Sequence, residues 1–152
     1  MSKSEPPPYC FEFQRRVEFA ETDMAGIMHF SNFYRFMESA EHAFFRSIGH
    51  GVHEKIDGET IGWPRVQTSC DFFKPVRFEQ MVTIRVTIEE IRRRSVRYVH
   101  TFLLGEEEEA TVVASGRMTT ACVRIDRENG KIESISIPDT LRASLEEAES
   151  KQ

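Results

Sequence analysis

An acidic residue and a histidine lie in a short loop just ahead of a strongly helical segment, and this placement could support chemistry at a carbonyl group. The first turn of a helix presents unpaired backbone N–H groups, so donors around Phe30 could stabilise the negative charge that develops when a nucleophile adds to a carbonyl. Asp23 lies eight residues ahead of Ser31, close enough to supply that attack. The spacing equally allows Thr22 and Asp23 to cap or shape a turn, so the residues alone leave both roles open.

Two further groups of side chains could carry chemistry. Glu38 and His42 stand four apart on one helix face and could ligate a metal, but no third ligand follows at a fixed spacing, so we expect no metal site. Trp63, Phe72 and Phe73 could line an aromatic acyl pocket or pack in the core. Aromatic residues beside a strand are usually core, and we expect that role for them.

The loop that carries Asp23 follows an expected strand. From Phe11 to Phe19 the apolar residues keep to odd positions, which is the period of a half-buried strand. Residues 20–30 break that alternation and include a glycine, so we expect a loop there.

A long helix is expected directly after the loop. Ser31 and Asn32 are favoured N-cap residues, and Gly49 supplies a natural stop. Apolar residues recur between them at helical spacing, namely Phe33, Phe36, Met37, Ala40, Phe44 and Ile48. A stripe of this bulk must lie against a sheet or a bundle.

Strands are expected downstream of the helix. The clearest is Met81–Glu90, where apolar and polar residues alternate strictly. A polar segment at 50–60 comes first, and the remaining expected elements are strands at 61–73, 95–104 and 110–123 and a last helix at 139–150. The predicted order is one strand, the long helix, four strands in a meander and a terminal helix. This is an α+β layout in which an antiparallel sheet packs against one helix.

Composition and charge exclude several classes of protein. A net charge of -5 argues against nucleic-acid binding, and no apolar run is long enough to span a membrane. The three cysteines are widely spaced and offer neither a zinc pattern nor a disulfide framework, so we expect reduced thiols and a cytoplasmic location. Residues 1–9, which hold three consecutive prolines, are expected to be a disordered leader before a single domain over 10–152.

The segment from Val17 to Glu38 resembles the N-terminal signature of the hydroxybenzoyl-CoA thioesterase family. It reads VEFAETDMAGIMHFSNFYRFME, in which an aromatic strand end is followed by Thr-Asp, a glycine, paired aromatic or histidine residues and an acidic residue in the helix. The similarity extends to Gly62–Pro64 and Glu90–Ser95. It implies the hotdog fold, an antiparallel sheet of about five strands wrapped around one long central helix. It also implies an acyl-CoA thioesterase without a cofactor, assembled as a homodimer or homotetramer.

The resemblance assigns roles near the start of the helix. Asp23 becomes the carboxylate that attacks the thioester carbon or activates water, and the backbone N–H of Phe30 becomes the carbonyl polariser. Many relatives place a Tyr-His pair before the helix, whereas this chain has His29 followed by Phe30, so the histidine is shifted by one position. His29 is a candidate to assist Asp23, and the alternative is a solvated or packing histidine. Glu38 is a supporting residue that could orient the site.

The resemblance also implies a site for the phosphates of coenzyme A. Arg92, Arg94 and Ser95 are its residues, because guanidinium groups pair with phosphates through charge-assisted hydrogen bonds. A solvated strand end is the alternative for this arginine run.

Two rival functions remain open. A non-catalytic module that binds acyl-CoA or acyl-carrier protein would keep the pocket without turnover. A hotdog dehydratase acting on hydroxyacyl thioesters would need an Asp-plus-His motif that the sequence does not show.

Overall fold

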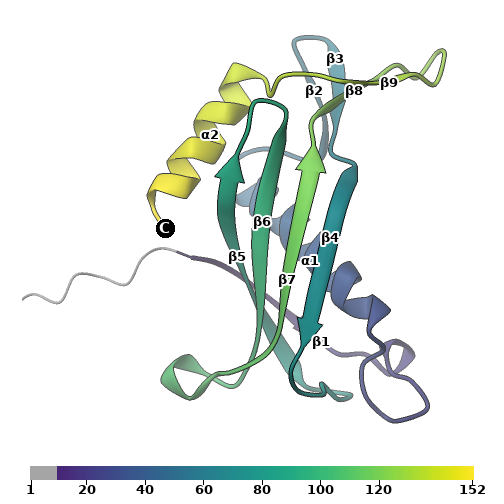
Figure 1. The fold of residues 1–152 in the computed structure, drawn as a ribbon, viewed down its shortest axis with the longest axis vertical. Coiled ribbons are helices and arrows are strands. Elements are labelled where there is room, and N and C mark those ends of the chain that lie inside the picture. The colour runs from purple at the N-terminus through teal and green to yellow at the C-terminus, as the bar shows by residue number, and fades with distance from the viewer. Residues whose placement is uncertain (1–9) are drawn as a thin grey trace, which may run out of the picture.

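A computed structural model describes residues 10–152, so the leader predicted at 1–9 lies outside the described residues. A five-stranded antiparallel sheet and a long helix make up most of this part of the chain (Figure 1). The sheet is built, in spatial order, from β1 (Phe11–Arg16), β5 (Met81–Ile91), β6 (Ser95–Leu104), β7 (Thr111–Ala121) and β4 (Arg65–Phe72). The sheet and its helix confirm the predicted α+β hotdog layout.

The predicted meander of four strands is wrong in one respect. Only β5, β6 and β7 follow one another as neighbours, whereas β4 pairs with β7 at the far edge of the sheet. The place beside β5 is taken by β1, whose Phe11 lies opposite Val86. The segment after Phe72 therefore carries the chain from one edge of the sheet back towards the other.

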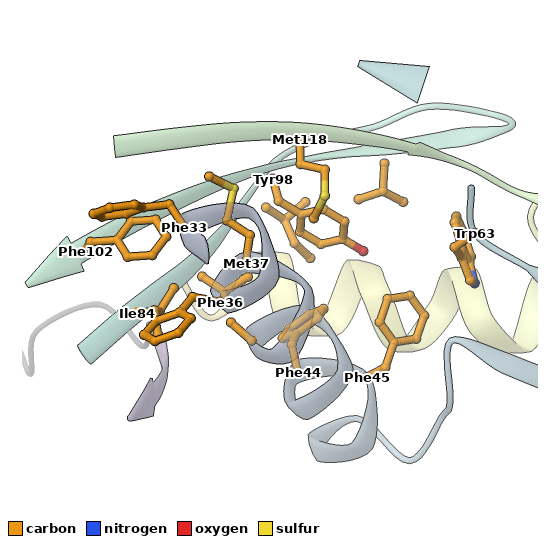
Figure 2. Packing of buried hydrophobic residues seen from close by; sticks show 14 of the residues in the cluster. Phe33, Phe36, Met37, Phe44, Phe45, Trp63, Ile84, Tyr98, Phe102 and Met118 are labelled. Carbon is orange, nitrogen blue, oxygen red and sulfur yellow. The ribbon is translucent and has the colours of Figure 1, made fainter. Parts of the chain in front are cut away.

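The central helix α1 (Ser31–Ser47) packs its apolar stripe on the sheet, as predicted. Phe33, Phe36, Met37, Phe44 and Phe45 project from α1 towards the sheet residues in Figure 2, namely Ile84, Tyr98, Phe102 and Met118. Each large apolar side chain buried in this way stabilises the fold by about 1.5–3 kcal/mol. The contact is close enough that a Cβ on Gly116 of β7 would lie 2.2 Å from Cε of Met37.

The start of α1 differs from the prediction. The N-cap is Phe30 rather than Ser31 or Asn32. The Asn32 side-chain amide instead donates to the carbonyl oxygen of Glu21, and the Ser31 N–H is taken by the His29 ring. Asn32 thus ties the helix to the loop before it instead of capping the helix.

A second, smaller sheet lies at the other end of α1 (Figure 1). Its strands, in spatial order, are β2 (His53–Ile56), β3 (Glu59–Gly62), β8 (Val123–Ile125) and β9 (Ile132–Ser134). The polar segment at 50–60, for which no element was predicted, therefore contains β2 and the start of β3. Asp57 and Gly58 both have positive φ, 52° and 80°, which suits the two-residue turn of the β2–β3 hairpin.

Three predicted boundaries also change. The strand predicted at 61–73 is two strands in different sheets, separated by Trp63 and Pro64, because proline cannot donate to a strand ladder. The strand predicted at 110–123 likewise divides into β7 and β8. The first strand ends at Arg16, and the residues that follow form a short 3₁₀ turn, η1 (Phe19–Glu21).

The chain ends in helix α2 (Asp139–Ser150), which has the predicted bounds. Leu141 and Leu145 of α2 are fully buried, so the helix is part of the packed structure. None of the helices found between residues 10 and 152 has the length and apolar character that crossing a membrane requires.

Candidate active site

An apolar groove of about 540 Å³ lies where the Asp23 loop, the start of α1 and the end of β4 meet. We call it the aromatic groove. It is lined by Asp23, Ile27, Met28, Phe30, Phe33, Phe72, Phe73, Lys74, Pro75 and Val76. Asp23 and Lys74 are its two charged residues, so a mostly apolar group would fit beside one carboxylate and one ammonium.

Asp23 both shapes its loop and keeps one oxygen free. Its Oδ1 accepts hydrogen bonds from the N–H groups of Ala25 at 2.9 Å and Ile27 at 3.4 Å. Gly26 supplies the left-handed turn with a φ of +79°, a conformation that glycine adopts without strain. Within residues 10–152, Oδ2 of Asp23 has no hydrogen-bond partner. Oδ1 therefore shapes the turn, and Oδ2 takes no part in holding it.

Phe30 also lines this groove, and its backbone N–H lies at the N-cap of α1. The next N–H groups along the chain are used, because Ser31 donates to the His29 ring, Asn32 to the His29 carbonyl and Phe33 to the Phe30 carbonyl. The Phe30 N–H makes no hydrogen bond to another residue of the described part of the chain. A free N–H at a helix start is suited to polarise a carbonyl oxygen.

Hydrogen bonds to two neighbouring segments hold the loop against the start of α1. The Met28 N–H donates to the carbonyl oxygen of Val76 at 2.6 Å, and the His29 N–H donates to that of Glu21 at 2.9 Å. Asp23 and Phe30 are therefore positioned by backbone pairing on both sides rather than by the loop alone.

Phe72 and Phe73 correct the core prediction. The two residues are 47% and 59% exposed and form a wall of the aromatic groove. Trp63 is 4% exposed and packs on Phe45, which confirms the predicted core role for this residue. Phe72 stands edge-on to Phe33 at 5.0 Å between ring centroids. β4 is an edge strand, so its last residues have no further strand to cover them.

Comparison with known proteins decides the family. Residues 17–145 match the model of the thioesterase-like superfamily, and this range covers the Asp23 loop, α1 and four of the five strands of the large sheet, all except β1. The chain belongs to the thioesterase-like superfamily.

Three similar proteins illustrate the relationship. A putative esterase of Aquifex aeolicus is 30% identical over 128 residues, which are 84% of this thioesterase and 91% of that protein. The 4-hydroxybenzoyl-CoA thioesterase of Pseudomonas sp. strain CBS-3 is 30% identical over 84 residues, 54% of this chain and 60% of that one. A solved gentisyl-coenzyme A thioesterase is 32% identical, with a TM-score of 0.74 over 87% of this chain and 99% of that chain. These matches support an enzyme that hydrolyses thioesters.

His29 of this thioesterase lies beside the aromatic groove without lining it. Its Nδ1 is 2.8 Å from the Ser31 hydroxyl oxygen, and its ring lies on the Phe30 ring at 4.6 Å between centroids. These contacts place the exposed imidazole over the start of α1.

Glu38 lies further along α1, outside the groove lining. Its carboxylate is about half exposed and stands 3.9 Å from both His42 Nε2 and Arg65 Nη2. Between residues 10 and 152 no three His, Cys, Asp or Glu side chains gather in a way that could hold a metal ion.

Arg92, Arg94 and Ser95 are not brought to the aromatic groove within one chain. They lie at the β5–β6 turn, at the opposite end of the sheet from the Asp23 loop (Figure 1). Arg92 is paired with Glu90 at 3.0 Å, which holds the pKa of that carboxyl below its usual value through a hydrogen bond. The Arg92 N–H donates to the Ser95 carbonyl and closes the turn.

Proposed function

We propose that this thioesterase hydrolyses an acyl-CoA to the free acid and coenzyme A, with Asp23 as nucleophile or general base and the Phe30 N–H as carbonyl polariser. One observation carries the proposal: the unpaired oxygen of Asp23 and the unpaired N–H of Phe30 belong to residues that line the same groove. Attack on a thioester needs an electron pair on one side of the carbonyl carbon and a donor at its oxygen.

Two chemical routes are consistent with this arrangement. If Asp23 attacks the thioester carbon, a mixed anhydride forms, coenzyme A leaves as a thiolate and water then cleaves the anhydride. If Asp23 acts as a general base, it takes a proton from water as the water oxygen adds to the same carbon. In both routes the oxygen of the carbonyl gains negative charge, which the Phe30 N–H stabilises.

An aromatic acyl group is the substrate class that we favour. The walls include the rings of Phe30, Phe33, Phe72 and Phe73, which can pack edge-on or offset against an aryl ring. The names of two relatives specify hydroxybenzoyl and gentisyl thioesters of coenzyme A. The Lys74 ammonium at the groove can pair with an anionic or hydroxyl substituent on such a ring.

We further propose that the protein is a homodimer or homotetramer in the cytoplasm. The outer edge of β4 presents unpaired backbone groups, and Val66 on this strand is 61% exposed. Pairing of β4 with a second copy would cover that edge and could bring Arg92, Arg94 and Ser95 of a second subunit to the coenzyme A phosphates. Light scattering tests the assembly, and a monomer at micromolar concentration would contradict it.

The test of the mechanism uses the two oxygens of Asp23. Asp23→Asn keeps Oδ1 as an acceptor for the loop and removes the charge, whereas Asp23→Ala removes both. We expect thiol release from an aryl-CoA to fall about 100-fold or more in both variants. Asp57→Asn, which changes an exposed carboxylate in the β2–β3 turn of the smaller sheet, outside the groove, is the matched control and should keep the native rate.

Acyl-CoA assays also distinguish the proposed hydrolase from the two alternatives, a non-catalytic binding module and a dehydratase. Equal thiol release in native protein and Asp23→Asn would discard the mechanism, and tight acyl-CoA binding without turnover would favour a binding module. Mass analysis of the products distinguishes hydrolysis, which gives a free acid, from dehydration, which gives an enoyl thioester.

A further inference from the structure

Three polar side chains from separate elements form a line at the C-terminal end of α1. His50 follows α1, Glu54 lies on β2 and Ser144 lies on α2. Nδ1 of His50 is 2.8 Å from Oε1 of Glu54, and Nε2 of His50 is 3.2 Å from Oγ of Ser144. A hydroxyl, an imidazole and a carboxylate joined in this order are the parts of a serine-nucleophile triad, which is recognised by geometry and not by sequence position.

Backbone structure fixes the histidine in this line. Gly49 has a φ of +83°, its N–H donates to the Arg46 carbonyl, and the N–H of His50 donates to the Phe45 carbonyl. This is the Schellman end of a helix, which ties the residue after the glycine back to the last turn. The imidazole is only 15% exposed.

The packing of α2 fixes the position of Ser144. Ser144 lies one residue before the fully buried Leu145 of α2. At the end of that helix, the Gln152 side chain accepts a hydrogen bond from the N–H of Ile88 and donates one to its carbonyl oxygen. The distance between Ser144 and His50 is therefore set by two packed elements.

The Glu54 carboxylate determines which ring nitrogen of His50 carries the proton. When Glu54 accepts the Nδ1–H of a neutral His50, Nε2 carries the lone pair and can accept the hydroxyl proton of Ser144. The same hydroxyl lies 3.2 Å from the Thr140 carbonyl oxygen, so its proton has two acceptors within reach, this carbonyl oxygen and Nε2 of His50.

Ser144 lines a cavity of about 250 Å³ between α1 and α2. Phe44, Ile48 and Ala148 give the cavity an apolar side. Lys151 supplies an ammonium group on its wall, 3.4 Å from Glu147. A cavity of this size takes a small ester, and the ammonium can face an oxygen that becomes negative.

The geometry points to a second reactive site, in which Ser144 is the nucleophile, His50 the base and Glu54 the orienting carboxylate, acting on small carboxylic esters. The Ser144 oxygen bonds to the ester carbonyl carbon as its proton passes to His50 Nε2. The C–O bond to the alcohol then breaks and the alcohol leaves with that proton. Water, deprotonated by His50, cleaves the acyl-serine to the acid and restores the hydroxyl.

A phosphonofluoridate probe tests the site directly. Its phosphorus bonds to an activated serine oxygen, fluoride leaves and the histidine keeps the proton, so the adduct is found by peptide mass spectrometry. We expect the adduct on Ser144 in native protein and equally in Asp23→Asn, because the aromatic groove is a separate site. We expect labelling to be absent in Ser144→Ala and about 100-fold slower in His50→Gln.

Ser150→Ala is the matched control, since Ser150 is on the same helix and its hydroxyl donates to the Glu147 carbonyl, with no hydrogen bond to a histidine of residues 10–152. It should label like the native protein. Ser144→Ala favours helix formation and should stay folded, which circular dichroism checks. Absence of the Ser144 adduct in folded native protein, or an unchanged labelling rate in His50→Gln, would overturn the proposal and leave the contact as a purely structural link between α1 and α2.

Discussion

Arg65 at the start of β4 donates a hydrogen bond of 2.6 Å to Glu41 on α1, so an ion pair joins the central helix to the edge of the sheet. The Glu41 carboxyl is fully buried, and its Oε1 has no hydrogen-bond partner within residues 10–152. Burial raises the pKa of Glu41 to about 7, Arg65 opposes that rise and the nearby Glu38 adds to it. A carboxyl group inside the fold is therefore poised to titrate near neutral pH.

This pKa predicts how stability depends on pH. Because the pKa is about 7 in the fold against 4.5 ordinarily, the contribution of Glu41 to stability is full below pH 4.5 and is lost as the pH rises to about 7. In Glu41→Gln the position is neutral at every pH. We expect the difference in unfolding free energy between native protein and this variant to change by on the order of 3 kcal/mol across that range. Urea denaturation at a series of pH values measures it, and a constant difference would show that Glu41 is ionised throughout.

Replacing the backbone donor at Phe30 isolates the carbonyl polariser. Phe30→Pro removes the N–H and suits the local φ of -54°, whereas Phe30→Ala removes the ring and keeps the N–H. We expect kcat for aryl-CoA hydrolysis to be about 100-fold lower in Phe30→Pro than in Phe30→Ala. Equal kcat values in two folded variants would remove this N–H from the mechanism.

Truncating Phe72 tests the wall of the aromatic groove. Phe72→Ala removes a half-exposed ring that lines the groove and contacts Phe33, so we expect kcat/KM for an aryl-CoA to fall about tenfold. Phe78 has the same 47% exposure but pairs with Phe19 outside the groove lining, so Phe78→Ala should change kcat/KM little. Similar losses in the two variants would show that the groove does not select the acyl group.

The close approach of α1 to β7 predicts a stability loss at Gly116. A Cβ there would lie 2.2 Å from Cε of Met37, so Gly116→Ala forces the buried methionine to move and should cost about 1–3 kcal/mol of unfolding free energy. At Gly51 a Cβ would meet only a backbone oxygen at 3.9 Å, and Gly51→Ala should stay within about 0.5 kcal/mol of the native value. Chemical denaturation compares the pair, and a neutral Gly116→Ala would mean that Met37 has room to repack.

The sequence by itself determined the elements whose side chains repeat with a clear period. The stripe from Phe33 to Phe44 predicted α1 and its buried face, and alternation predicted β5 almost to the residue. The β-branched and aromatic residues of 95–104 predicted the bounds of β6. The signature around Asp23 also predicted a site at this loop, and Asp23 lines the aromatic groove. Periodicity and local signals of this kind depend on neighbours along the chain, and such neighbours can be read from the sequence.

Only the tertiary structure decided which segments lie side by side. It placed β4 beside β7, left Phe72 exposed at a groove and buried Glu41 against Arg65. The spacing of apolar residues along a helix or strand shows which face is apolar, but it does not show what covers that face. An edge strand and a central strand can therefore carry similar residues. His50 and Ser144 meet across 94 positions of sequence for the same reason, because packing of α2 against the end of α1 brings them together.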